Sequence, residues 1–260
     1  PAYIFIYLIL MYISTKFFKR IMFPIRSTSG KVIGFSGRIL SGNDKGPKYM
    51  NTPETQIYHK KDNVFGQYES RKAIRKEDLV IFCEGQTDVI SAHQKGIENI
   101  VAPLGTALTI EQLERLSKLT KNFFFIFDSD TAGQEAMERA LLLVSKLKLR
   151  AYAASPDPYK DIDEMLQKDE KKLKTLIKQK TDLFSFLLSK KIEDLSPSDY
   201  TDITSTLNWA KRILSKIPSQ SLRSIYVNSL LNSHFFDPVM ISDIKNELLN
   251  PSRRSARKPQ

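Results

Sequence analysis

Apolar runs and segments with helical spacing alternate through the middle of the chain. The strand-like apolar runs fall at Asp78–Cys83, Asn99–Ala102, Phe123–Phe127 and Leu149–Ala154. Segments with a helical repeat follow them, at Thr87–Lys95, from Thr109 (with Gln112 completing a capping box), at about Ala132–Leu147 and from Asp163. Strands and helices that alternate in this way predict a mostly parallel β-sheet with helices on both faces, and therefore an α/β fold.

Two segments of different character flank this region. Residues 22–50 carry short β-prone runs between glycines at positions 30, 34, 37, 42 and 46, which predicts hairpins and loops. From about Leu173 onward the pattern is helical, and Pro197, Pro218 and Pro238 interrupt it. We therefore divide the chain, which is α+β overall, into a basic β-rich part (1–76), an α/β part (77–170), a helical part (171–250) and a basic tail (251–260).

The two ends of the chain differ in composition. Residues 2–14 form an apolar run of roughly 13 residues, which is shorter than the ~20 needed to span a membrane. We interpret this run as a buried strand or an irregular terminus, although an upstream extension could lengthen it into a span. Because the chain opens on Pro1, we expect it to be truncated there. The last ten residues are basic and have no apolar run, which favours a disordered tail.

The net charge indicates a polyanionic partner. The 260 residues include 40 Lys and Arg against 29 Asp and Glu, a formal charge of +11. Basic residues are in excess in 1–80 and 131–260, whereas acidic residues are in excess in 81–130. This distribution suits a metal-dependent enzyme that acts on nucleic acid, but solvation of the surface explains it equally well. A single cysteine and three histidines exclude a disulfide framework and a zinc finger, and favour a reducing, cytoplasmic compartment.

Acidic residues stand just past three of the four predicted strands. In chain order the residues at the strand ends are Glu84 and Gly85, then Gly105, then Asp128 and Asp130, then Asp161 and Asp163. Because parallel strands end on the same edge of a sheet, these side chains should converge. A cation that shares clustered carboxylates relieves their repulsion, and oxygen ligands suit Mg²⁺ or Mn²⁺. The alternative is that Asp130 and Asp163 only cap the helices that follow them.

These motifs resemble the Toprim signature that bacterial primases, topoisomerases and some nucleases share, and the finer similarity is to the DnaG-type bacterial primases. It is carried by CEGQTDVISAHQKGIENIVAPLGTALT (83–109), FDSDTAGQEAMERAL (127–141), RIMFPIRSTSGKVIGFSGRIL (20–40) and PKYMNTPETQIYHK (47–60). The similarity runs from about Arg20 to Leu249. It implies a Toprim, Rossmann-like parallel sheet between a basic β-rich amino-terminal subdomain and a carboxyl-terminal helical subdomain.

The resemblance also implies roles for individual residues. Glu84, Asp128 and Asp130 would be catalytic, and Asp161 and Asp163 would join them as ligands of two or more Mg²⁺ or Mn²⁺ ions. Asp88, Gly85 and Gly105 would support that site. The residues implied in binding template strand and incoming nucleotide are Arg26, Arg38, Lys48, Tyr49 and Lys60. Lysine and arginine neutralise phosphates and tyrosine can stack on a base, but solvated loop charges and a packing aromatic would give the same pattern.

The activity that the resemblance implies is that of a primase catalytic core, a DNA-directed RNA polymerase that makes short RNA primers during replication. The implied partners are a single-stranded DNA template, NTPs, the RNA–DNA hybrid and, through a domain absent from this chain, the replicative helicase. Zinc in this region and a membrane partner are not expected. Two alternatives stay open: a Toprim nuclease or topoisomerase that cleaves phosphodiesters, and a catalytically incomplete fragment that only binds nucleic acid.

Overall fold

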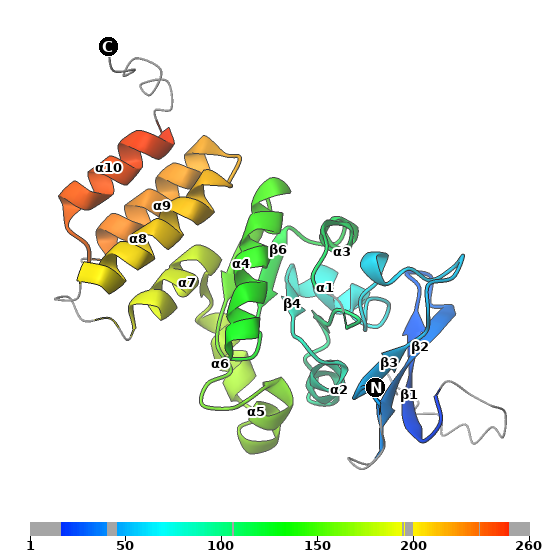
Figure 1. The fold of residues 1–260 in the computed structure, drawn as a ribbon. Coiled ribbons are helices and arrows are strands. Elements are labelled where there is room, and N and C mark those ends of the chain that lie inside the picture. Colours follow the sequence, from blue (N-terminus) through cyan, green and yellow to red (C-terminus); the bar gives the residue numbers. More distant parts are fainter. Residues whose placement is uncertain are drawn as a thin grey trace.

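The computed structural model describes residues 17–40, 46–105, 107–193, 195, 200–233 and 235–249, which form three parts in a row (Figure 1). A small antiparallel sheet occupies one end, a five-stranded sheet between helices forms the centre, and a group of helices occupies the other end. This is the arrangement that the sequence predicts. The predictions for residues 2–14 and 251–260 fall outside the described residues.

The amino-terminal sheet consists of β1 (Arg20–Arg26), β2 (Val32–Ile39) and β3 (Tyr49–Asn51), paired in that order. Phe23 and Ile25 alternate with more exposed neighbours on β1, so one face of this sheet is buried against the body of the molecule. Gly30 makes the turn between β1 and β2 with a φ of +90°, a conformation that favours glycine. The predicted hairpin is thereby confirmed.

The central sheet has the strand order β5-β4-β6-β7-β8. Its strands are β4 (Val80–Phe82), β5 (Ile100–Val101), β6 (Asn122–Phe125), β7 (Arg150–Ala153) and β8 (Thr181–Asp182). The first four are parallel, whereas β8 pairs antiparallel with β7 at one edge. Strand β4 is apolar throughout because both faces of the sheet are covered: Val80 and Phe82 belong to one apolar cluster and Ile81 to the other.

Helices cover the two faces of the central sheet. One face carries α2 (Gln86–Gln94), α5 (Ile162–Lys168) and α6 (Lys172–Lys178), and the other carries α3 (Ile110–Leu116), α4 (Thr131–Lys146) and α7 (Leu183–Ile192). The turn η1 (Lys60–Asp62) and helix α1 (Arg71–Glu77) lie between β3 and β4 in the chain. The capping box predicted at Thr109 is confirmed, because Thr109 and Gln112 exchange two hydrogen bonds of 3.2 Å.

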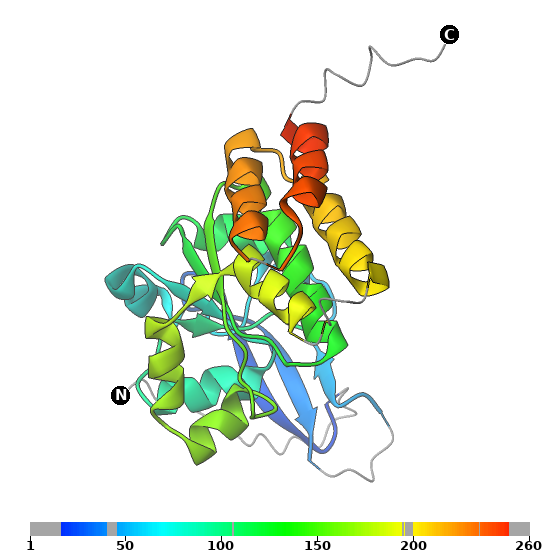
Figure 2. The same ribbon diagram turned by 90° about the vertical axis from the view of Figure 1, so that its left-hand side faces the viewer.

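Helices α8 (Tyr200–Ser215), α9 (Gln220–Asn232) and α10 (Pro238–Leu249) form the other end of the molecule, away from the amino-terminal sheet (Figure 2). The Phe184 ring of α7 stacks on Trp209 of α8 and on Tyr226 of α9, with centroid distances of 5.9 and 4.4 Å. Pro218 lies between α8 and α9 as predicted. Pro238 begins α10, where a missing N–H loses no helical hydrogen bond.

The central sheet extends past the boundary that we place at residue 170. β8 follows α6 and adds an edge strand, so residues 171–182 belong with the sheet as much as with the helical part. The strands are also shorter than the predicted apolar runs; β6, for example, ends at Phe125, although Ile126 and Phe127 remain buried. Pro197 lies outside the described residues. Among the described helices, none is long and apolar enough to cross a membrane.

Candidate active site

Glu84 and Asp128 lie side by side at the carboxyl edge of the central sheet. They follow the paired strands β4 and β6, in which Phe82 lies opposite Phe125, so the chain leaves both strands at the same level. The Asp128 N–H donates a hydrogen bond of 3.0 Å to Glu84 Oε1. The strand order thus brings these two acidic residues together. We call Glu84, Asp128, Asp130 and Asp161 the acidic edge.

Asp130 places the start of α4 beside Glu84. Its Oδ1 accepts a hydrogen bond of 2.8 Å from the Gly133 N–H, so Asp130 does cap α4. A Cβ atom on Gly133 would lie 2.1 Å from the Asp128 carbonyl oxygen and 3.0 Å from Glu84 Oε1. Only glycine permits this close approach, and Gly133 therefore sets how near α4 lies to the loop that carries Asp128.

Burial and acidic neighbours raise the pKa values of Glu84 and Asp128. Partial burial raises the pKa of Glu84, and the charge of Asp128 raises it further. The pKa of Asp128 is also raised, first by burial and then by the charges of Asp161 and Asp130. Groups in this condition favour a bound cation, because a cation removes the repulsion between the ionised forms.

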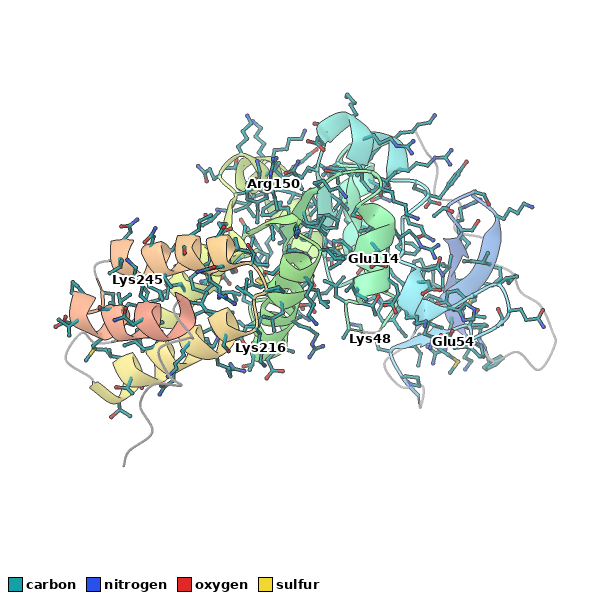
Figure 3. The ribbon with its side chains drawn as sticks, turned by 90° about the horizontal axis from the view of Figure 1, so that it is seen from above. Lys48, Glu54, Glu114, Arg150, Lys216 and Lys245 are labelled. Carbon is teal, nitrogen blue, oxygen red and sulfur yellow. The ribbon has the colours of Figure 1, made fainter. Side chains whose placement is uncertain are left out.

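Lys48 of the amino-terminal part faces this acidic edge. Its charge and that of Lys160 act to lower the pKa of Asp128, although burial and the acidic neighbours outweigh them. Figure 3 shows Lys48 where the amino-terminal sheet meets the central part. Next to Lys48, the guanidinium carbon of Arg38 lies 5.9 Å from the centroid of the Tyr49 ring, because Arg38 and Tyr49 pair across β2 and β3. Three of the five predicted nucleic-acid-binding residues are therefore neighbours.

The other two predicted binding residues have different surroundings. Arg26 Nε lies 3.2 Å from a carboxylate oxygen of Glu69, and its Nη1 donates to the Gly30 carbonyl at 2.9 Å. Lys60 begins η1, and its carbonyl accepts a hydrogen bond of 3.1 Å from Gln112 Nε2. The Arg26 side chain and the Lys60 main chain thus brace the fold, and the nucleic-acid contacts of these two residues stay predictions.

Asp88 is buried beneath the acidic edge, with 4% of its surface exposed. Its two oxygens accept hydrogen bonds of 3.0 Å from the N–H groups of Gly85 and Asp163, which ties the start of α2 to the start of α5. Burial raises the pKa of Asp88 to about 7; the charges of Asp161 and Asp128 act in the same direction, and the two N–H groups oppose them. The supporting role that the resemblance implies for Asp88 and Gly85 stays a prediction.

Asp161 and Asp163 both lie at the start of α5 but differ in their contacts. Asp161 caps α5 by accepting a hydrogen bond of 2.8 Å from the Glu164 N–H, and its charge reaches Asp128. The Asp163 carboxylate accepts hydrogen bonds from Ser91 Oγ and from Gln167 Nε2. Asp163 therefore contacts α2, and its role as a metal ligand stays a prediction.

Gly105 lies where the amino-terminal sheet joins the central sheet. Asn51, the last residue of β3, donates from Nδ2 to the Leu104 carbonyl at 2.7 Å. Gly105 has a φ of +68°, and a Cβ there would lie 3.1 Å from the same Asn51 nitrogen. A larger residue would be strained here and would press on the link between the two sheets.

The donor set of the acidic edge suits a hard divalent cation. Glu84, Asp128 and Asp130 offer only carboxylate oxygens, and a cation would relieve their repulsion. Within the described residues, no three His, Cys, Asp or Glu side chains already form a group able to hold a metal ion. Glu84 and Asp130 each use one oxygen for a backbone N–H, so ligation by these two residues would rely on their second oxygens.

Several residues that shape the acidic edge are not among those predicted from the sequence. Gly133 carries a signal that could identify it, since a glycine in the first turn of a helix stands where alanine is more stable by about 1 kcal/mol. Lys160 faces Asp128, and Ser129 donates to Asp157 Oδ1 at 2.5 Å. For these residues the sequence has no such signal, because their importance lies in contacts between separate loops.

A parallel sheet with Glu84 after one strand and Asp128 and Asp130 after its neighbour defines a Toprim-type domain. A family model described as Toprim-like accordingly matches residues 81–166. A second model, described as the DNA primase catalytic core, N-terminal domain, matches residues 11–71, and so begins earlier than the resemblance noted from Arg20. The chain belongs to the DnaG-type bacterial DNA primase family.

Individual relatives agree with this membership. The DNA primase of Aquifex aeolicus is 39% identical over 181 residues, which are 69% of this chain and 36% of that protein. A DNA primase domain from Pseudomonas aeruginosa has a crystal structure with a TM-score of 0.73 and 33% identity, covering 88% of this chain and 72% of that one. A DnaG primase catalytic domain bound to single-stranded DNA has a TM-score of 0.69 and 31% identity, covering 82% and 70%. The chain thus spans little more than a third of the Aquifex relative.

The close approach at Gly133 can be tested by adding a single methyl group. We expect Gly133→Ala to destabilise the fold by about 1–3 kcal/mol, because the Asp128 carbonyl is backbone and cannot move aside cheaply. Helix propensity alone predicts the opposite sign. Urea unfolding would measure the change, with Ala132→Ser, on an exposed position of the same turn, as the control. A more stable Gly133→Ala protein would contradict this account.

Burial of Asp88 should make stability depend on pH. Its pKa of about 7 lies above the ordinary value of 3.8, so the folded protein binds more protons than the unfolded chain between these values. Stability should therefore fall as the pH rises from about 4 to about 7, by at most about 4 kcal/mol from this group. Urea unfolding at pH 5, 6, 7 and 8 should show a weaker pH dependence for Asp88→Asn than for the unsubstituted protein. Parallel curves would show that Asp88 does not titrate in this range.

Proposed function

We propose that this chain is the RNA polymerase core of a bacterial primase, a nucleotidyltransferase that joins NTPs into short RNA primers on single-stranded DNA during replication. The observation that carries the proposal is the acidic edge, with Lys48 of the basic amino-terminal part facing Asp128. Carboxylates suit the cations of phosphoryl transfer, and lysine suits the phosphates of a nucleic acid. The related catalytic domain that is bound to single-stranded DNA supports that template.

In the proposed reaction, the 3′-hydroxyl of one nucleotide attacks the α-phosphate of the next and pyrophosphate leaves. Two or more Mg²⁺ or Mn²⁺ ions bound by the acidic edge would neutralise charge on the attacking and leaving oxygens. Gly133 and the cap formed by Asp130 keep the start of α4 against the loop that carries Asp128. Lys48 and Arg38 would neutralise phosphates of the template or nucleotide, and Tyr49 would offer a ring to a base.

Asp128→Ala should abolish primer synthesis while barely changing the affinity for single-stranded DNA. The substitution removes one carboxylate from the acidic edge but no basic side chain. Incorporation of labelled ribonucleotides on single-stranded DNA, with Mg²⁺ or Mn²⁺, would measure synthesis, and fluorescence anisotropy would measure DNA affinity. A parallel loss of both would mean that Asp128 acts on the fold rather than on the chemistry.

Lys48→Ala should show the reverse pattern, with weaker binding of DNA or nucleotide. If Lys48 neutralises one phosphate, the slope of log affinity against log salt concentration should become shallower by about 0.7, the value for a single strand. Lys178→Ala, which removes an exposed lysine from α6, is the control and should leave the slope unchanged. An unaltered slope in Lys48→Ala would argue against phosphate contact at this position.

The same carboxylates could instead support phosphodiester cleavage by a Toprim nuclease or topoisomerase. Supercoiled plasmid incubated with the chain and Mg²⁺ should stay intact if the chain is a primase core. Nicking or relaxation that Asp128→Ala abolishes would overturn the proposal in favour of cleavage. A folded chain that binds DNA but extends neither new primers nor a pre-annealed one would instead be a nucleic-acid-binding fragment.

A further inference from the structure

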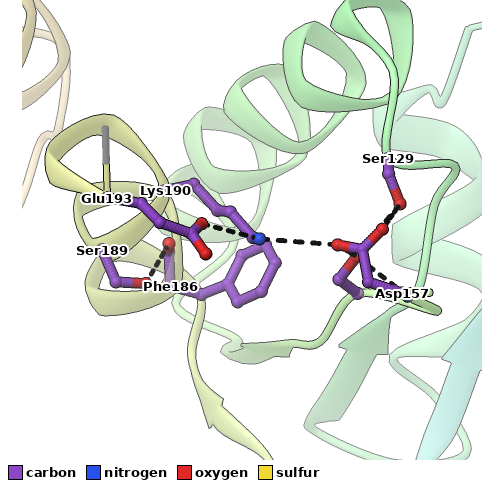
Figure 4. Close-up of polar contacts among 7 residues, drawn as sticks. Ser129, Asp157, Phe186, Ser189, Lys190 and Glu193 are labelled. Carbon is purple, nitrogen blue, oxygen red and sulfur yellow. Dashed lines mark hydrogen bonds and ion pairs between the residues drawn. The ribbon is translucent and has the colours of Figure 1, made fainter. Parts of the chain in front are cut away.

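Hydrogen bonds connect the loop between Asp128 and Asp130 to α7 (Figure 4). Ser129 Oγ donates to Asp157 Oδ1 at 2.5 Å, and Lys190 Nζ lies 3.4 Å from Asp157 Oδ2. Ser129 stands between two carboxylates of the acidic edge, whereas Lys190 belongs to the last turns of α7. Asp157 thus joins a loop of the central sheet to the helix on which the helical part packs.

Asp157 also binds the loop after β7. Ser155, two residues beyond the end of β7, donates from Oγ to Asp157 Oδ2 at 2.5 Å, and its Oγ lies 3.1 Å from that of Ser129. The same loop continues to Asp161 at the start of α5. One carboxylate therefore receives donors from the loops that follow β6 and β7, and each of these loops carries part of the acidic edge.

The contacts favour the ionised form of Asp157. Burial alone would raise its pKa, but hydrogen bonds from Ser129 and Ser155 and the charge of Lys190 outweigh burial and lower it. Lys190 is shared, because its Nζ also lies 2.8 Å from a Glu193 oxygen. The side chains of Lys190 and Asp157 are 28% and 46% exposed, so this ion pair is partly open to solvent and adds little stability by itself.

We infer that Asp157 is a positioning residue that clamps the loops carrying Asp128 and Asp161, and that Lys190 anchors this clamp to α7. The physical reason is that the carboxylates of the acidic edge repel one another, so the two loops that carry them need a restraint from other residues. Asp157 supplies that restraint while using its oxygens for Ser129, Ser155 and Lys190 rather than for a cation. The catalytic meaning of the clamp rests on the proposed function, but its effect on cation binding can be measured without catalysis.

A double-mutant cycle between Ser129 and Lys190 would test the clamp, because among the described residues their connection runs through Asp157. The cycle uses Ser129→Ala, Lys190→Met and the double variant of the full chain, with the dissociation constant for Mn²⁺ measured by electron paramagnetic resonance. Each single substitution should weaken Mn²⁺ binding by roughly tenfold, the size of effect seen when residues behind metal ligands are changed. In the double variant, Mn²⁺ binding should be weakened by much less than the product of the two single effects, since either change already releases Asp157.

Two further variants separate the clamp from a general effect on folding. Lys190→Arg should restore Mn²⁺ binding, because arginine can also pair with Asp157. Ser189→Ala removes a hydroxyl that donates to the Phe186 carbonyl of the same helix, and this variant should bind Mn²⁺ like the unsubstituted chain. Thermal unfolding of every variant should show no loss of stability that parallels the change in Mn²⁺ affinity.

The outcomes distinguish this inference from the proposed function. The clamp would be overturned, even if the chain makes primers, by single variants that bind Mn²⁺ normally. It would also be overturned if the double variant lost Mn²⁺ affinity by the full product of the two single effects. The expected Mn²⁺ pattern in a chain that makes no primers would leave the clamp standing and remove the proposed function. A chain that binds no Mn²⁺ would overturn both.

Discussion

The hydrogen bond from the Asp128 N–H to Glu84 Oε1 fixes two like-charged residues at neighbouring strand ends, and the candidate site depends on it. A hydrogen bond to a charged acceptor contributes about 1.5–3 kcal/mol, which opposes the repulsion between the two carboxylates. The position of both groups comes from the sheet beneath them. Phe82 and Phe125, opposite each other on β4 and β6, stack with a centroid distance of 5.5 Å and are fully buried. The apolar core therefore holds the strand ends in place where electrostatics would separate them.

The uneven distribution of charge along the sequence becomes a separation in space. The amino-terminal part, which carries Lys48 and Arg38, is attached to the central sheet through Asn51 and the Leu104 carbonyl. This attachment brings a basic surface to an acidic edge without mixing the two. Nucleic-acid phosphates and divalent cations need opposite charges in their surroundings, and the proposed function assigns the phosphates to the amino-terminal part and the cations to the acidic edge.

The sequence predicts features that depend on local pattern. The apolar runs locate the parallel strands, the strand exits identify Glu84 and Asp128, and the capping box at Thr109 forms as expected. Features that depend on packing between distant segments are not predictable in this way. β8 is two residues long and includes Asp182, so it has no apolar run, and the contact of Asp163 with Ser91 follows from how α5 lies on α2. The same holds for Asp157, whose partners stand 28 residues before it and 33 after it.

The raised pKa values of Glu84 and Asp128 connect the stability of the site to its chemistry. Protons and cations relieve the same repulsion, so they compete for the acidic edge. Because the pKa values of Glu84 and Asp128 are raised, protons displace cations here at a higher pH than they would at ordinary carboxylates. Lys48 and Lys160 act against this loss, because they favour the ionised form of Asp128 before any cation arrives. Under the proposed function, Lys48 and Lys160 would serve the cation site as well as the nucleic acid, because their charges act to lower the pKa of Asp128 that burial raises.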